Sequence, residues 1–278
     1  MTLQEAKQAL IHKLEPLENP GLEARVLMKH QLGMTDVDLI LKSSSPLSID
    51  DEENLFHMAD ERLTGRPSAY ITGEREFYGY RFHVTEDVLI PQPDTEILVE
   101  TSLDFLKTKT NAEVLDLCTG SGCIITALKA EDRTINAHAS DLSPRALSIA
   151  KENYEANIGE ECDMRPGSLL EPWDGKKFDL IATNPPYVTE EWFKEVSDEV
   201  KHEPVLALID RAEDGLGLIR EIIRTAPEHL NDGGMLIIES DYRQTEEIRN
   251  LLGERGFHGI RTVKDLAGRE RSTLGFYG

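Results

Sequence analysis

The sequence contains little of what metal sites and disulfide frameworks require. Its 278 residues include three cysteines, Cys118, Cys123 and Cys162, and no two of them form a CxxC pair. The eight histidines form no HExxH or HxH pattern. Because zinc sites and disulfide frameworks depend on such spacings, we expect neither a bound metal nor a disulfide framework.

Long apolar runs are also missing. No stretch reaches the roughly 18 apolar residues of a transmembrane helix, so we expect no membrane partner. The first residues, MTLQEAKQALIHKLEP, have the spacing of an amphipathic helix rather than the order of a secretion signal. We therefore expect a cytoplasmic protein.

Positive charge is scarce. The 30 Lys and Arg residues are outnumbered by 52 Asp and Glu residues, which gives a formal net charge of −22. Wide contact with phosphate backbones depends on clustered Lys and Arg, so we expect no direct binding of nucleic acid, although a local basic patch is compatible with this balance. The length and a hydrophobic content of 39% suit one large domain and a smaller one.

The chain begins with helical patterns and then changes character. Apolar residues recur at helical spacing over residues 3–14, 22–32 and 49–63, and Ser48 is a candidate cap for the third helix. EFYGYRFHV, residues 76–84, is typical of a β-hairpin. We expect a helical domain over 1–68, a hairpin linker over 69–90 and the main domain over 91–278.

From Glu113 onward, strand and helix patterns alternate, as in a doubly wound α/β sheet. We expect five strands at EVLDLC, INAHASD, MRPGS, FDLIAT and MLIIE, the last after a turn at residues 231–234, and two more near FHGIRTV and STLGFYG. The fold class is therefore a Rossmann-like, seven-stranded α/β sheet with a small helical domain. The spacing of Trp192, Val196 and Val200 predicts a helix over 190–200 with a solvated charged face.

A glycine turn follows the first strand of this pattern. Asp116, the turn Thr119-Gly120-Ser121-Gly122, and Asp141 at the next strand end form a nucleoside-binding arrangement, in which a carboxylate accepts both ribose hydroxyls. The turn lacks the third glycine of GxGxxG and has no Lys-Ser/Thr for a triphosphate. This combination disfavours dinucleotides and nucleoside triphosphates, and S-adenosyl-L-methionine fits better.

Ser168 and Leu169 follow the third strand, where the edge and face of an adenine could be recognised. Two alternatives stay open here. Asp141 could cap the helix that begins at Ser143-Pro144, and Leu169 could be an ordinary core residue.

The NPPY segment, residues 184–187, ends the strand FDLIAT. Pro185 and Pro186 have no N–H to donate, so the chain leaves the sheet there, and Asn184 is biased towards an extended conformation. The Asn184 side-chain oxygen and the Pro185 carbonyl could accept both N–H bonds of a planar amide or amine, with Tyr187 against its face. The alternative is a proline-rich turn after a buried strand.

The segment VLIPQPDTE precedes the sheet. Pro91 and Pro93 interrupt an extended run, and Asp94 or Thr95 could cap the helix that follows. Taken alone, this segment is a simple connection from strand to helix.

The glycine turn, the acidic strand end and NPPY, in this order, resemble S-adenosylmethionine-dependent methyltransferases of planar nitrogens. Along nearly its whole length the chain resembles the release-factor glutamine methyltransferases, through RPSAYITGEREFYGYRF, VLIPQPDTEILVE, VLDLCTGSGCI, SDLSPRALSIAKEN, FDLIATNPPYV, EPVLALIDRAEDGL, GGMLIIE and DLAGRER. The chain departs from the family pattern in having Gln92 for Arg, Asp94 for Glu, Cys118 for Gly, Ser240-Asp241 for Gly, and Leu169 where some members have an aromatic residue.

The resemblance implies a monomer that methylates the side-chain nitrogen (N5) of the GGQ glutamine in class I peptide-chain release factors, with the helical domain docking that partner. It implies catalytic roles for Asn184, Pro185 and Tyr187. Cofactor contacts are expected from Asn184 and from Asp116, Cys118, Thr119, Gly120, Ser121, Gly122, Asp141, Leu142, Ser168 and Leu169. Substrate contacts are expected from Asn184, Pro185, Pro186, Tyr187, Pro91, Thr95 and Glu96.

Two other functions compete with this one. (D/N)PPY also suits amino groups of DNA or RNA bases, which in a duplex would need flipping into the pocket. A non-catalytic homologue that binds release factors without turnover is the second.

Glu203-Pro204 could brace the loop after NPPY, or form a surface ion pair or turn.

Overall fold

The computed structural model describes residues 1–265 and 267–278, which form two compact units. The first comprises Met1–Glu74 with Ser197–His202, and the second comprises Arg75–Val196 with Glu203–Gly278. Leu266, within the predicted DLAGRER motif, lies outside the described residues. The role of residues 69–90 as a linker stays a prediction.

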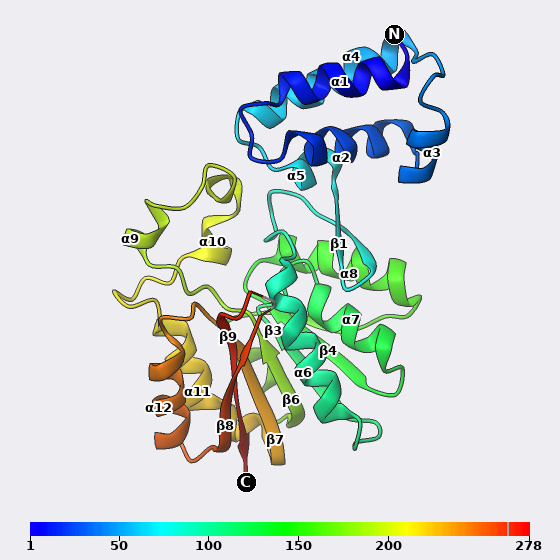
Figure 1. Cartoon of the computed structure of the whole chain (residues 1–278). Coiled ribbons are helices and arrows are strands. Elements are labelled where there is room, and N and C mark those ends of the chain that lie inside the picture. The colour runs from blue at the N-terminus through cyan, green and yellow to red at the C-terminus, as the bar shows by residue number, and fades with distance from the viewer. Residues whose placement is uncertain (266) are drawn as a thin grey trace. The chain divides into compact units, whose positions relative to one another are not determined.

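The first unit is helical, as the apolar spacing predicts (Figure 1, blue to cyan). Ser48 caps the fourth helix, because its hydroxyl accepts a hydrogen bond of 3.0 Å from the Asp51 N–H. The short third helix was not predicted, since six residues show little periodicity, yet Thr35 and Asp38 form a capping box at its start. The elements are α1 (Leu3–Lys13), α2 (Pro20–Leu32), α3 (Asp36–Leu41), α4 (Ile49–Leu63), α5 (Ser68–Thr72) and the 3-10 turn η3 (Val200–His202).

Residues 197–202 join this unit through a buried arginine. Arg62, on α4, is almost fully buried and forms ion pairs with Glu23 at 3.0 Å and with Glu199. A buried guanidinium is stable only when its charge is paired, so these two carboxylates hold α2 and the 197–202 segment against α4.

The second unit contains the predicted seven-stranded sheet in the order β5-β4-β3-β6-β7-β9-β8. β5, β4, β3, β6 and β7 are parallel, and β9 is antiparallel to both of its neighbours. The strands of this sheet are β3 (Glu113–Leu117), β4 (Asn136–Asp141), β5 (Asp163–Pro166), β6 (Phe178–Thr183), β7 (Leu230–Glu239), β8 (His258–Lys264) and β9 (Glu270–Tyr277).

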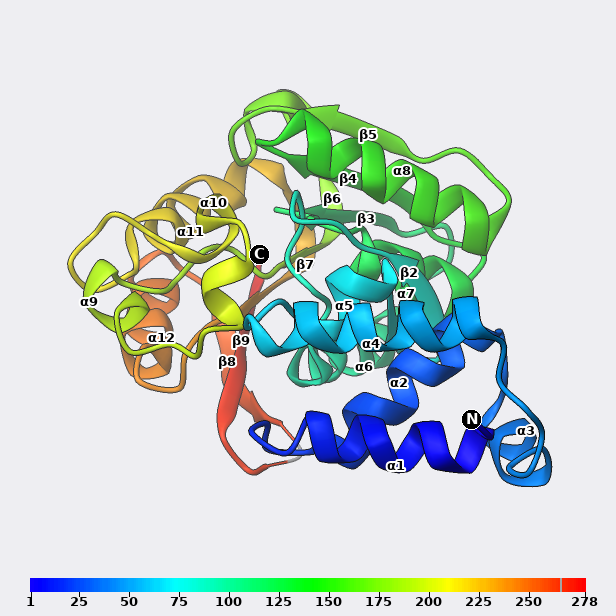
Figure 2. The same ribbon diagram turned by 90° about the horizontal axis from the view of Figure 1, so that it is seen from above.

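Helices cover both faces of this sheet (Figures 1 and 2). One core packs α6 (Glu96–Leu106), α7 (Cys123–Glu131) and α8 (Pro144–Ile158) against it, and the other packs α11 (Gly217–His229) and α12 (Thr245–Glu254). The predicted hairpin is β1 (Glu74–Phe77) and β2 (Tyr80–His83), and it adds Phe77 and Phe82 to the first core. Shorter elements are η1 (Pro93–Thr95), η2 (Glu171–Trp173), α9 (Glu190–Phe193) and α10 (Val205–Leu208).

The helix predicted over residues 190–200 is wrong. Only α9 forms, started by Thr189, whose hydroxyl accepts from the Trp192 N–H. The Trp192 ring lies under the Arg243 guanidinium, 3.6 Å from the ring centroid. Val200 belongs to the first unit, so the residues of the predicted apolar stripe have partners in different units.

Two local predictions also differ from the structure. Residues 231–234 do not precede β7 but form an irregularity inside it, since Phe178 pairs with Leu230 and Leu180 with Met235. Neither Asp94 nor Thr95 caps α6, because the Thr95 hydroxyl bonds to other segments and Asp94 pairs with Arg271 at 3.0 Å. Long-range partners decided both cases.

Candidate active site

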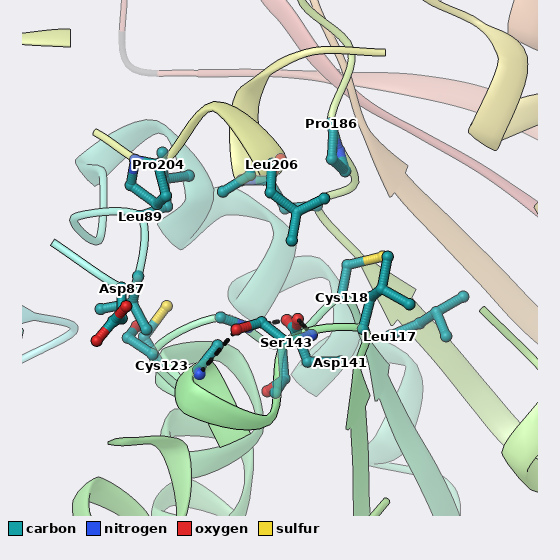
Figure 3. Close-up of a pocket in the computed structure, with 18 of the residues that line it drawn as sticks. Asp87, Leu89, Leu117, Cys118, Cys123, Asp141, Ser143, Pro186, Pro204 and Leu206 are labelled. Atoms are coloured by element: carbon teal, nitrogen blue, oxygen red, sulfur yellow. Dashed lines mark hydrogen bonds between the residues drawn. The ribbon is translucent and has the colours of Figure 1, made fainter. Parts of the chain in front are cut away.

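A cavity of about 370 Å³ opens at the C-terminal ends of β3, β4 and β6, within the second unit (Figure 3). This is the edge at which open α/β sheets bind ligands, and the volume is that of a small-molecule site. The chain reaches this edge through loops that follow the strands. The predicted site residues that line the cavity are Pro91, Thr95, Cys118, Thr119, Gly120, Ser121, Asp141, Leu142, Ser168, Leu169, Asn184 and Pro186.

The other predicted site residues are not part of this lining: Glu96, Asp116, Gly122, Pro185 and Tyr187. The Glu96 carboxylate accepts a hydrogen bond of 2.8 Å from the Tyr78 N–H. The Tyr187 carbonyl accepts one of 3.0 Å from Gln244 Nε2. Contacts of these residues with a ligand stay predictions.

Asp116 anchors the glycine turn. Its Oδ2 accepts hydrogen bonds from the Thr119 hydroxyl at 2.5 Å and from the Ile125 N–H at 3.3 Å. Its Oδ1 is buried and has no partner among the described residues. Burial raises the pKa of this carboxyl to about 7. Asp116 therefore fixes the conformation of the turn through these two hydrogen bonds.

The turn itself needs unusual backbone conformations. Gly120 and Gly122 have φ of +55° and +78°, and a Cβ on Gly122 would lie 3.0 Å from the Ala150 Cβ. Gly122 is thus required by close packing against α8. Cys118 also has a positive φ, +62°, at the position where the resembling family has glycine. Its thiol has a pKa raised by burial, so it is not a reactive thiolate.

Asp141 faces the cavity with both carboxylate oxygens partly satisfied. Oδ2 accepts from the Gly120 N–H at 2.9 Å and Oδ1 accepts from the Ser143 N–H at 2.8 Å (Figure 3). The Leu142 N–H is a third backbone donor near this carboxylate, so at least one acceptor position remains for a further donor. Burial raises the pKa of this carboxyl. The cap of α8 is Ser143, which accepts from the Ala146 N–H, so the capping alternative for Asp141 is wrong.

Apolar side chains border the same region. Leu142 is 56% exposed, although leucine side chains are usually buried, and Leu169, with φ of +48°, lines the cavity while packing partly against the second core. Across the cavity, Pro204 and Leu206 form the opposite wall (Figure 3). A free acceptor position on a carboxylate beside exposed apolar surface fits the ribose and adenine of S-adenosyl-L-methionine.

Asn184 extends from the end of β6 into this lining. Its Nδ2 donates to Glu239 Oε1 at 3.0 Å and lies 3.4 Å from the Thr95 hydroxyl. Both amide hydrogens therefore have acceptors in the protein. Among the described residues no group donates to the carboxamide oxygen, which stays available to a substrate donor. Pro185 is buried, so the chain after Asn184 is held by packing.

Glu239 is a site residue that the sequence reasoning missed. It ends β7 and is 3% exposed, next to Asn184 at the same edge of the sheet. A carboxylate at the end of the apolar run MLIIE was a usable signal, because buried carboxylates need a specific partner.

The surface alternative for Glu203 is wrong. Glu203 is buried rather than at the surface, and its Oε2 accepts a hydrogen bond of 2.9 Å from the Ile90 N–H. It therefore braces the VLIPQPDTE segment, and its role in bracing the loop after NPPY stays a prediction. Gln92, one of the departures from the family pattern, donates to the Ile90 carbonyl at 3.1 Å.

Other classes of site receive no support. Among the described residues, no group of His, Cys, Asp and Glu is placed to hold a metal ion. In the same part of the chain, no helix combines the length and the apolar content of a membrane span.

Two family models match separate segments of the chain. The PrmC N-terminal domain matches residues 2–73 and the Methyltransferase small domain matches residues 93–216. The solved structure of the T. thermophilus 16S rRNA N2 G1207 methyltransferase, in complex with AdoMet and guanosine, shares the fold with a TM-score of 0.55 at 18% identity, covering 74% of this chain and 50% of that one.

Curated relatives match over the full length. A release factor glutamine methyltransferase of Neisseria gonorrhoeae is 38% identical over 93% of this chain and 94% of its own. One of Vibrio cholerae is 38% identical over 100% of this chain and 97% of its own. The chain belongs to the release factor glutamine methyltransferase family, and through its methyltransferase domain to the enzymes that use S-adenosylmethionine.

Proposed function

We propose that this protein methylates the side-chain nitrogen (N5) of the glutamine in the Gly-Gly-Gln motif of class I peptide-chain release factors, with S-adenosyl-L-methionine as donor. It would thereby support translation termination in the cytoplasm, as a monomer. The observation that carries this proposal is the Asn184 carboxamide, whose oxygen is left free beside a cavity that suits the donor.

An amide nitrogen is a weak nucleophile because its lone pair is delocalised into the carbonyl group. Asn184 Oδ1 and the Pro185 carbonyl would accept the two N–H bonds of the glutamine amide and hold its nitrogen in place. These acceptors stabilise charge more strongly as the N–H bonds become more acidic during transfer. Tyr187 would flank the amide plane.

Bound S-adenosyl-L-methionine supplies an electrophilic methyl group. In the overall reaction an N–C bond forms, the S–C bond breaks to leave S-adenosylhomocysteine, and one amide proton is lost to water. We expect no dedicated general base, since the proton can leave after transfer.

Asp141 would hold the ribose, Leu142, Ser168 and Leu169 the adenine, and the turn at Thr119 the amino-acid tail. The acceptor capacity left on Asp141 supports its part in this assignment. Pro91 and Thr95 line the cavity and would contact the substrate or close over the donor.

The helical unit would dock the release factor. Its surface carries apolar side chains that are unusually exposed for their type: Val37, Ile40, Leu41 and Ile49 are 63 to 78% exposed. An Ile40→Glu, Leu41→Glu double variant should raise KM for the release factor and leave kcat and donor affinity unchanged.

The direct test is incubation with labelled S-adenosylmethionine and purified release factors that carry either Gly-Gly-Gln or Gly-Gly-Ala. Label should enter only the Gly-Gly-Gln form, on the glutamine side chain. Label in DNA or RNA would identify the protein as a nucleobase methyltransferase. Tight release-factor binding without label transfer would identify a non-catalytic homologue.

A further inference from the structure

The buried carboxylate of Glu239 contacts Asn184 but has no role in the function described so far. Oε1 of Glu239 accepts from Asn184 Nδ2 at 3.0 Å, and the nearby Thr95 hydroxyl lowers the pKa of the same carboxyl. Thr95 thus contacts both partners, since its hydroxyl also lies 3.4 Å from Asn184 Nδ2. The three residues come from β7, β6 and the segment before α6.

An asparagine side chain can rotate by half a turn and exchange its oxygen with its nitrogen. An ionised carboxylate is acceptor-only, so it selects the orientation in which the nitrogen faces it. In the opposite orientation, the Asn184 oxygen would face the Glu239 oxygen in buried surroundings, and two acceptors would lack a donor. The carboxylate therefore decides which atom of Asn184 is left for the substrate.

We propose that Glu239 is a positioning residue, which fixes the Asn184 carboxamide with its oxygen available to the glutamine amide. The proposal rests on the methyl transfer proposed above and deepens it. Without Glu239, an Asn184 nitrogen could occupy the oxygen's place, where it would repel the N–H donors of the substrate.

The surroundings of Glu239 bring the pH at which its carboxyl ionises close to neutrality. Burial raises the pKa of its carboxyl to about 7, and Asp94 on η1 acts in the same direction, while Arg271 on β9 opposes them. Tyr187, in the loop after β6, and Cys123, on α7, are also titratable groups near it, and burial raises the pKa of both. Above about pH 7 Glu239 is therefore the acceptor that the proposal requires.

The first test is Glu239→Gln, which keeps the side-chain shape. A glutamine offers both a donor and an acceptor, so it accommodates either orientation of Asn184. We expect kcat to fall by about 10- to 100-fold, since small misplacements of reacting groups have effects of this size. KM for the release factor and affinity for S-adenosylhomocysteine, measured by calorimetry, should change by less than about 2-fold.

Asp179→Asn is the matched control, a carboxylate-to-amide change at the opposite end of β6. Asp179 accepts from the Glu113 N–H, and its pKa is lowered, so its loss should reduce the melting temperature without affecting kcat. At pH 8, Glu239→Gln should instead raise the melting temperature, because it removes a buried charge, and should lower kcat. A parallel fall of kcat and melting temperature in Glu239→Gln would overturn the proposal and indicate a structural role.

The second test needs no substrate. In nitrogen-15-labelled protein, the Asn184 side-chain signals, assigned by their loss in Asn184→Ala, should shift with pH with a midpoint near 7. The Glu239→Gln variant should lack this titration. Asn184 side-chain signals that are the same in wild type and in the Glu239→Gln variant across this pH range would overturn the proposal.

The two proposals can fail separately. If wild-type protein methylates no release factor, the proposed function fails and the Asn184 signals still decide the role of Glu239. If wild type is active and Glu239→Gln keeps its kcat within about 2-fold, the positioning role fails and the proposed function stands.

Discussion

Two strand ends at the same edge of the sheet carry buried carboxylates in similar states. Asp116 lies on β3 and Glu239 ends β7, and burial raises the pKa of each to about 7. In both, one oxygen accepts hydrogen bonds, and the other has no partner among the described residues. They differ in where their partners come from.

The partners of Asp116 are local, since Thr119 and Ile125 follow it within the same turn and helix. The partners of Glu239, Thr95 and Asn184, are far from it in sequence. In the donor half, which would bind S-adenosylmethionine, the glycine turn is therefore shaped by one continuous segment. The acceptor half, which would bind the glutamine amide, exists only after three segments have met. The two halves should respond separately to mutation.

The largest expected effect is a loss of methyl transfer without a loss of affinity for S-adenosylmethionine, caused by a change in the acceptor half. Asn184→Ala should reduce methyl transfer by at least about 10²-fold, because an acceptor that acts in the transition state is lost. Donor affinity should stay within about 2-fold. Single-turnover transfer of labelled methyl and calorimetry measure the two quantities. Asn157→Ala, which removes a structural amide of α8, is the control, and near-normal turnover of Asn184→Ala would refute its assigned role.

Asp141→Ala should affect the opposite half. Loss of a carboxylate that accepts hydroxyl donors should weaken donor binding by about 10- to 100-fold, while kcat at saturating donor stays close to normal. Because Ser143 rather than Asp141 caps α8, the helix should persist, which circular dichroism can check. Unchanged affinity in calorimetry would contradict the ribose assignment.

The shared property of the two carboxylates predicts a pH dependence of stability. Between about pH 4 and pH 7, a carboxyl with a raised pKa keeps in the folded state a proton that it has lost in the unfolded state. Its contribution to the free energy of unfolding is therefore full below about pH 4 and disappears as the pH rises through about 7. Asp116→Asn should remove it. The melting-temperature difference, variant minus wild type, should therefore increase from pH 5 to pH 8, and a flat difference would show that Asp116 titrates normally.

The smallest effect concerns the positive φ of Cys118. Cys118→Gly should relieve backbone strain and stabilise the protein by up to about 1 kcal/mol, the gain being partly offset by lost packing. Urea denaturation measures it. Gly122→Ala should destabilise, because the new Cβ would lie 3.0 Å from Ala150. A loss of stability in Cys118→Gly would mean that the buried thiol matters more than the strain.

Features with local causes could be predicted from the sequence. The strands, the glycine turn, the hairpin and the Ser48 cap follow from apolar period, turn residues and side chains that bond within three positions. Predictions failed where a distant partner competed. Trp192 lies against Arg243 instead of on a long helix, and Asp94 pairs with Arg271 instead of capping α6.

The sequence by itself determined the order of the elements, the α/β class and the family, because period-two and helical patterns and the NPPY and TGSG motifs are local in the chain. Only the tertiary structure decided that Glu239 and Thr95 orient Asn184, and that Gly122 serves the packing of α8. Hydrogen-bond partners that are far apart in the sequence have no fixed spacing, so no sequence pattern reveals them. Their energy depends on burial, which exists only once the sheet has formed.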